Sequence, residues 1–169
     1  EPQALLGVLH VIRRVQRASR YAHDWAFERL DMNVEEVALA ALLHDLAEIL
    51  LWCFAPKLAL EIRHRQQADP TLPSTIAQEL ALCQVWNLPE LLKTLMDDTH
   101  AETPRVRNVV LAVNLARHSA QSWENPALPE DLMGIEKLLH VDRDILLKRL
   151  EVPDPIAARY LSPPEPTAS

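Results

Sequence analysis

The chain has 169 residues, and its 17 Lys and Arg residues against 24 Asp and Glu residues give a net charge of −7. This length suits one domain with a substantial core. An acidic balance excludes an overall electrostatic footprint for nucleic acid. Hydrophobic residues make up 49% of the chain, aromatic residues only 5%, and there are two glycines. We therefore expect an all-α fold with a core of Leu, Ala and Val.

Apolar spacing and prolines predict a compact multi-helix bundle of about seven helices. In chain order, seven helices are expected from about 3 to 30, 33 to 54, 57 to 67, 74 to 86, 89 to 100, 103 to 123 and from 129 onward, followed by a short last helix from 141 to 150. Asn33 with Glu36 has the pattern of a capping box at the second start. We expect one helical domain over 1–152 and a Pro-rich flexible tail over 153–169.

Cys53 and Cys83 lie in apolar helical surroundings without Cys-x-x-Cys spacing, which predicts reduced core residues of a cytoplasmic protein. No signal peptide pattern is present at the amino end. The apolar stretch 37–55 reaches transmembrane length, but the charged residues near its centre favour a buried helix over a membrane span. Because the chain begins at Glu1 rather than Met, we expect it to be a fragment of a longer protein.

The doublet His44-Asp45 interrupts this apolar stretch. An imidazole and a carboxylate are costly to bury unless they are paired, hydrogen-bonded or bound to a metal. Neighbouring residues of a helix point about 100° apart, so both side chains reach one ion only if it lies over the edge between them. Two interpretations stay open: a buried hydrogen-bonded pair, or two ligands of an iron, manganese, zinc or magnesium ion.

Further polar groups extend the set of candidates. His100 follows two aspartates at a predicted helix end, where it either helps to bind a cation or interacts with the helix dipole. Asn114 and His118 stand four residues apart on an apolar helix and favour an internal polar network. Arg13, Arg17 and Arg20 share one face of the first helix; we interpret this row as a solvated surface or as a grip for phosphate or an acidic partner.

The stretch Ala40-Ala-Leu-Leu-His44-Asp45-Leu-Ala-Glu-Ile-Leu, followed by Trp86-Asn-Leu-Pro89 and then His100, resembles the HDOD domain, the HD-related output domain of bacterial signalling proteins. The resemblance covers about residues 5–150. It implies an HD-like helical bundle, a degenerate relative of the HD-domain phosphohydrolases. It also implies fused signalling modules such as receiver or cyclic-di-GMP-turnover domains, and a helical amino-terminal subdomain before the portion present here.

The resemblance also implies that much of the catalytic metal site is lost. The first metal-binding His of active HD enzymes falls near Ala18, and a later Asp falls near Asn114. His44, Asp45 and possibly His100 remain as a vestigial metal set. Without a firmly bound ion there is no Lewis acid and no activated water for hydrolysis. The Gly-Tyr-Pro element of the cyclic-di-GMP phosphodiesterase branch is missing as well.

Three functional hypotheses follow. The first is a non-enzymatic regulatory domain of the HDOD type, cytoplasmic, which acts through protein–protein or ligand binding and needs no cofactor. Its partners would be signalling proteins or fused signalling domains, and a homo-oligomer is compatible; no nucleic acid or membrane is expected. The second is a metal-dependent phosphohydrolase acting on a nucleotide or other phosphoester, with a divalent metal on His44 and Asp45 and phosphate on Arg17 or Arg20. The third is a small-molecule or nucleotide sensor without turnover.

Overall fold

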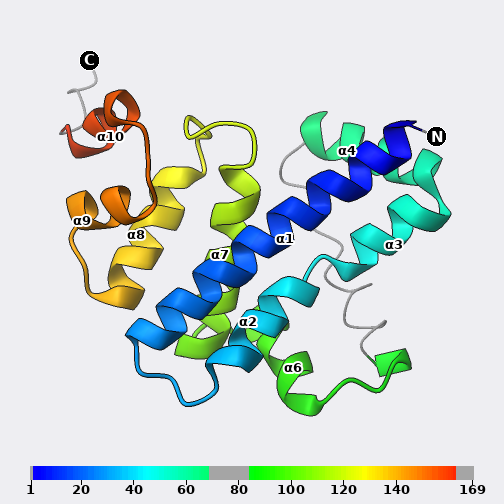
Figure 1. Ribbon diagram of the computed structural model, residues 1–169, viewed down its shortest axis with the longest axis horizontal. Helices are drawn as coiled ribbons and strands as arrows, with labels where there is room; N and C mark the ends of the chain where they lie inside the picture. Colours follow the sequence, from blue (N-terminus) through cyan, green and yellow to red (C-terminus); the bar gives the residue numbers. More distant parts are fainter. Residues whose placement is uncertain (1, 69–83, 163–169) are drawn as a thin grey trace.

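The computed structural model describes residues 2–68 and 84–162. The regular elements are α1 (Pro2–Glu28), α2 (Val34–Leu43), α3 (Leu46–Phe54), α4 (Pro56–Ala68), α6 (Glu90–Leu95), the 3-10 turn η1 (Asp98–His100), α7 (Pro104–His118), α8 (Leu128–Leu139), α9 (Arg143–Arg149) and α10 (Asp154–Leu161). All are helical, which confirms the predicted all-α class (Figure 1). The helix expected over 74–86 falls almost wholly outside the described residues.

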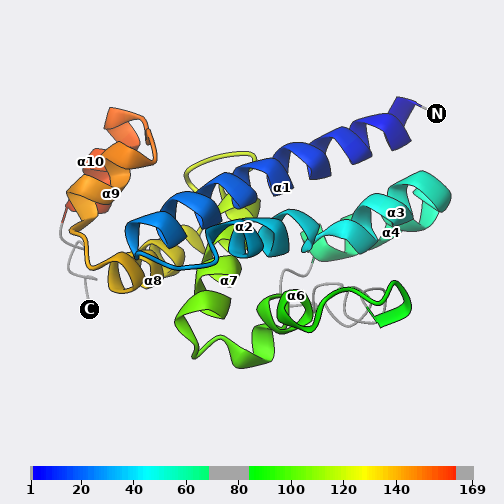
Figure 2. The same ribbon diagram turned by 60° about the horizontal axis from the view of Figure 1, so that its bottom comes forward.

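Helix α1 is the scaffold of the molecule, because one side of it is buried along nearly its whole length. Its buried residues are Gly7, Val11, Val15, Ala18, Ala22, Trp25 and Ala26. Their spacing of three or four residues places them on one helical face. This face packs against α2, α3 and α7. Both ribbon views show α1 crossing the molecule from α3 and α4 at one end to α8 at the other (Figures 1 and 2).

The larger part of the molecule, which we call the body, consists of residues 16–43 and 84–162. Its buried apolar side chains form one cluster, which joins the second half of α1 to α2, α6, α7, α8 and α9 and extends from Ala18 to Val152. Helix α7 lies at its centre and touches α1, α2, α6 and α8. The bidentate contact of Arg105 with Asp31, at 3.0 Å and 2.7 Å, fixes the turn between α1 and α2 onto the start of α7.

The smaller part, which we call the wing, consists of the first half of α1 (residues 2–15) with α3 and α4. It has a separate cluster of four buried residues, Val11, Val15, Trp52 and Ala59. A Cβ atom on Gly7 would lie 2.4 Å from the Trp52 ring. The close approach of α1 to α3 therefore requires glycine at this position. Figure 2 shows the wing extending away from α8, α9 and α10.

The helix expected over 33–54 is divided in two. Helix α2 ends at Leu43, and α3 begins at Leu46 with Asp45 as its N-cap residue, at φ −103° and ψ 24°. The prediction of one continuous helix is wrong because polar partners from distant helices surround this point, as described below. Asn33 is the N-cap of α2 as expected, but its side chain makes no capping hydrogen bond.

Two further expectations need correction. The predicted flexible tail begins with a helix, because residues 154–161 form α10, and the hydroxyl of Tyr160 donates a 2.5 Å hydrogen bond to the carbonyl of Trp123. Its side chain and that of Ile156 pack against the core of the body, so helix formation there is supported by tertiary contacts. Cys53 is exposed on α3 rather than part of the core, because Trp52 takes the buried position beside it. Cys83 lies outside the described residues.

Several helix ends also differ from expectation. Helix α6 ends at Leu95, and the turn η1 follows it instead of a continuation to 100. Helix α7 ends at His118, five residues before the expected end at 123. Within the described chain, the stretch Val34–Phe54 is long and apolar enough to cross a membrane, a property that core helices of other proteins share.

Candidate functional site

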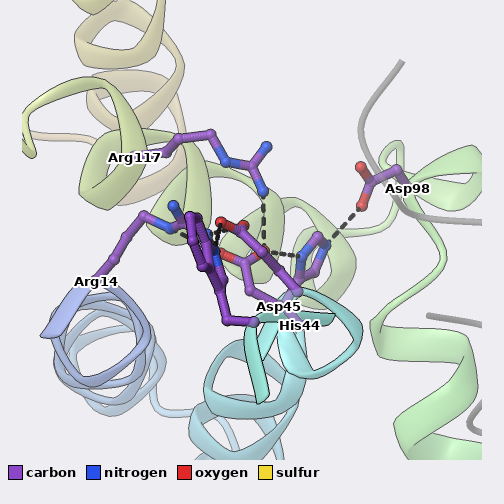
Figure 3. Close-up of polar contacts among 7 residues, drawn as sticks. Arg14, His44, Asp45, Asp98 and Arg117 are labelled. Carbon is purple, nitrogen blue, oxygen red and sulfur yellow. Dashed lines mark hydrogen bonds and ion pairs between the residues drawn. The ribbon is translucent and has the colours of Figure 1, made fainter. Parts of the chain in front are cut away.

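Two ionisable side chains, His44 and Asp45, are buried at the break between α2 and α3. Asp45 is only 1% exposed, and two arginines hold its carboxylate. From α1, Arg14 donates from Nε to Oδ2 at 2.8 Å, and its Nη2 also contacts Oδ2. From α7, the Nη2 atom of Arg117 donates to Oδ1 at 2.9 Å. Figure 3 shows these side chains converging on Asp45 from two helices. We call Arg14, Asp45 and Arg117, together with His44 and Glu48, the ionic site.

The charges at this site favour an ionised Asp45. Burial alone would raise the pKa of this carboxyl group. The hydrogen bond with His44 and the positive charges of Arg117 and Arg14 outweigh it, so the pKa of Asp45 lies far below its usual range. Burial likewise opposes the charge of Arg14, but the charges of Asp45 and Glu48 outweigh it and raise the pKa of Arg14. Asp45 is therefore a permanent anion at any physiological pH.

His44 is also buried, at 2% exposure, and each of its ring nitrogens faces a carboxylate. Its Nδ1 atom lies 3.3 Å from Oδ1 of Asp45, and its Nε2 atom lies 3.4 Å from Oδ1 of Asp98 in η1. The imidazole therefore spans from the α2–α3 break to the turn after α6 (Figure 3). A protonated ring has a donor for each of these two carboxylates.

Glu48 connects the ionic site to the core of the wing. Its Oε2 atom accepts a 2.5 Å hydrogen bond from Nη2 of Arg14. Its Oε1 atom accepts a longer one, 3.4 Å, from the indole nitrogen of Trp52. The guanidinium of Arg63 lies over the Trp52 ring, 4.4 Å from the ring centroid. The largest buried side chain of the wing is thus tied to the same charges that hold Asp45.

The structure brings together only some of the residues that the sequence singled out. His44 and Asp45 are in contact, but His100 is exposed and lies near Asp97 and Glu102. From the same segment it is Asp98 that faces His44. Ala18 is buried in the body core.

The remaining predicted residues lie apart from Asp45. Asn114 on α7 is half-buried. His118, which the sequence paired with Asn114, instead contacts Asp131 of α8 at 2.6 Å. Arg20 is exposed on α1, and Arg17 donates to the hydroxyl of Ser119 at 2.7 Å.

Sequence reasoning missed Arg14 and Arg117 as partners of Asp45. Arg14 stands in the same basic stretch as Arg13, Arg17 and Arg20. A usable signal was present, because Arg14 lies three residues after buried Val11 and four before buried Ala18 and so borders the buried face of α1. Another missed residue is Asn108 on α7, which is fully buried with both amide atoms without a hydrogen-bond partner in the described chain.

The donor set of the ionic site does not fit a divalent metal. Both oxygens of Asp45 are already bonded to guanidinium groups. Two unit charges of like sign repel by about 4 kcal/mol at 4 Å near a protein surface, and a divalent ion beside two arginines would face several times this energy. Within the described ranges, no group of three or more His, Cys, Asp or Glu side chains is arranged to hold a metal. The arrangement can orient side chains and join helices.

No known protein family matches the chain, and no curated protein or solved structure matches it either.

Proposed function

We propose that this chain is a non-enzymatic, cytoplasmic regulatory domain of the HDOD type, which acts by binding signalling proteins or a ligand. The observation that supports this proposal is the double arginine contact of Asp45. Active HD enzymes use this aspartate as a metal ligand, whereas here Arg14 and Arg117 occupy its oxygens. The two guanidinium groups supply the positive charge that a metal would otherwise bring, so the buried carboxylate is neutralised without an ion.

The arrangement suits a signalling role because one cluster touches several helices. Asp45 sits between α2 and α3, Arg14 comes from α1, Arg117 from α7, and Asp98 from η1. A partner that shifts any of these elements would change contacts made by the others. The exposed free thiol of Cys53 agrees with a reducing compartment such as the cytoplasm.

The first experiment measures metal content per chain by inductively coupled plasma mass spectrometry on protein purified without chelator or added metal. We expect far less than one equivalent of iron, manganese, zinc or magnesium, and no change in the His44→Ala variant. The matched control is His23→Ala, because His23 and Asp24 form the same doublet on the exposed surface of α1.

A full equivalent of metal that is lost in His44→Ala and kept in His23→Ala would contradict the proposal. It would favour the alternative, a metal-dependent phosphohydrolase, and a screen of nucleotides and other phosphoesters would then test for hydrolysis directly.

A further inference from the structure

An open cavity beside α1 collects three arginines. Its volume is about 580 Å³, and it is lined by Arg13, Gln16, Arg17, Ser19, Arg20 and Leu42. Five of these residues come from two turns of α1, and Leu42 comes from α2. No Asp or Glu is among the lining residues. Three positive charges and no negative charge line this open depression, so its electrostatics favour an anion.

These three arginines have no ion-pair partner in the described chain. Seven other arginines there pair with acids: Arg14, Arg65, Arg105, Arg117, Arg143, Arg149 and Arg159. Arg29, Arg63 and Arg107 lack an ion pair in the described chain as well, but they do not form a row on one helix. The chain carries more acidic than basic residues, so acidic side chains were available to neutralise these three arginines. Like charges three and four residues apart destabilise a helix. An unrelieved row of this kind in an acidic protein is the signature expected of a site for an external anion.

Arg17, the middle residue of the row, is held in place by neutral groups. Its Nη2 atom donates to Oγ of Ser119 at 2.7 Å and to the hydroxyl of Tyr21 at 3.3 Å. Ser119 is buried and in turn donates to the carbonyl of Leu115. These contacts restrict the guanidinium without neutralising it. A positioned, uncompensated guanidinium binds phosphate with little loss of side-chain entropy.

The length of the row indicates what kind of anion fits. At 1.5 Å rise per residue, Arg13 and Arg20 are about 10 Å apart along the axis of α1. This distance is too long for one phosphate group to contact all three arginines. We propose that the cavity binds a small molecule with several phosphate groups, such as a nucleoside triphosphate. The proposal names a ligand for the regulatory domain and so rests on the proposed function. None of the residues of the ionic site lines this cavity.

The test uses isothermal titration calorimetry of the full chain with ATP, AMP and inorganic phosphate at low salt. We expect ATP to bind more tightly than AMP or inorganic phosphate, because its two additional phosphates can reach further arginines, whereas AMP and inorganic phosphate each offer one phosphate group. Raising the salt concentration should weaken all three interactions. In Arg17→Gln, ATP affinity should fall at least about tenfold, since a charge-assisted, bidentate contact is lost.

Two other variants keep the test decisive. Arg20→Gln changes an exposed side chain, so it leaves the fold intact, and it should weaken ATP in the same direction. Arg107→Gln is the matched control: it removes another arginine that has no ion pair in the described chain, from α7 outside the cavity, and should leave the affinity unchanged. The proposal is overturned if ATP does not bind, if Arg107→Gln weakens it as much as Arg17→Gln, or if AMP binds as tightly as ATP.

Failure of the site and failure of the proposed function give different results. The calorimetry samples are also assayed for released inorganic phosphate. Binding of intact ATP supports both proposals. ATP that binds through Arg17 and is then hydrolysed would leave the site standing and contradict the non-enzymatic function. Absence of binding would overturn the site, while the metal measurement would still decide the proposed function.

Discussion

The wing and the body bury their apolar residues to very different extents. The body has a continuous core that joins helices from both halves of the sequence. Among the residues that the structure describes, the wing has four buried residues in its own cluster, and large apolar side chains are exposed on it: Leu5, Leu6, Leu9, Phe54 and Leu58. Burial of apolar area is the main source of stability. The comparison indicates that the wing is held by its attachment to the body more than by its own core.

The ionic site lies where the two parts meet. Arg14 belongs to the wing, Arg117 belongs to the body, and both bond to Asp45 at the start of α3. Glu48 extends the contact to Trp52 in the wing. The same carboxylate therefore lies at the break between α2 and α3 and joins the wing to the body. The predictions below test this division of the molecule, from the largest expected effect to the smallest.

Asp45→Ala should lower the free energy of unfolding by about 3–5 kcal/mol, because it leaves two arginines beside a buried site without their anion. Urea denaturation followed by circular dichroism measures the change. Asp24→Ala is the matched control, since this aspartate follows a histidine in the same way but is exposed, and its effect should be close to zero. Equal stabilities of the two variants would mean that the ionic site does not hold the parts together.

Trp52→Ala should lower the free energy of unfolding by about 3 kcal/mol, because it opens a cavity in the wing. We expect the loss to be local. Hydrogen exchange should speed up for the amides of α3 and α4, while α7 and α8 keep their protection. Leu132→Ala, in the core of the body, should instead speed up exchange throughout the chain. Global loss of protection in Trp52→Ala would show that wing and body unfold as one unit.

Gly7→Ala should destabilise the wing by about 1–3 kcal/mol, because the added methyl group would overlap the rigid Trp52 ring. Gly134→Ala provides the comparison in the body. There the new Cβ would lie 2.7 Å from a terminal methyl of Leu111, a flexible side chain that can move. Helix propensity favours alanine by up to about 1 kcal/mol, so this variant should be neutral or slightly more stable. Thermal melting of both variants checks the contrast.

Acid should weaken the junction through Asp45. Its pKa is lower in the folded than in the unfolded chain, so its contribution is complete above the unfolded pKa of about 4 and falls as pH drops below that value. Between about pH 4 and pH 3, the wild type should lose roughly 1 kcal/mol more per pH unit than Asp45→Asn, which has no proton to bind there. Denaturation curves at each pH provide the two slopes; parallel slopes would contradict an ionised Asp45 in the fold.

The helical class and most helix starts could be predicted from the sequence, because they depend on local patterns. Prolines and capping residues lie at the beginnings of α4, α7 and α8, and the apolar spacing identifies the buried face of α1. The break between α2 and α3 could not be predicted in this way. Its cause is the contact of Asp45 with Arg14 and Arg117, which are separated from it by 31 and 72 residues along the chain. A local sequence pattern carries no information about contacts between residues so far apart.

The candidate site was predicted in part. The buried doublet His44-Asp45 stands out in an apolar stretch, so its polar role could be expected. The partners of Asp45 could not be predicted, because the sequence holds several arginines and only the packing of the helices selects Arg14 and Arg117. Helix α10 was missed for a related reason: its prolines and polar residues are typical of a tail, while the Tyr160–Trp123 hydrogen bond that anchors it joins residues 37 positions apart.

Asp45 is separated from its two arginines by unequal lengths of sequence, so the two ion pairs become possible at different times during synthesis. Arg14 precedes Asp45 by 31 residues, whereas Arg117 follows it by 72. When α3 leaves the ribosome, its carboxylate can already pair with α1, so the wing can form while the centre of the body is still untranslated. The second arginine arrives only with α7, and until then the apolar stretch Val34–Phe54 lacks the body helices that cover α2. At this stage the growing chain exposes a long apolar segment, which is the kind of surface that molecular chaperones bind.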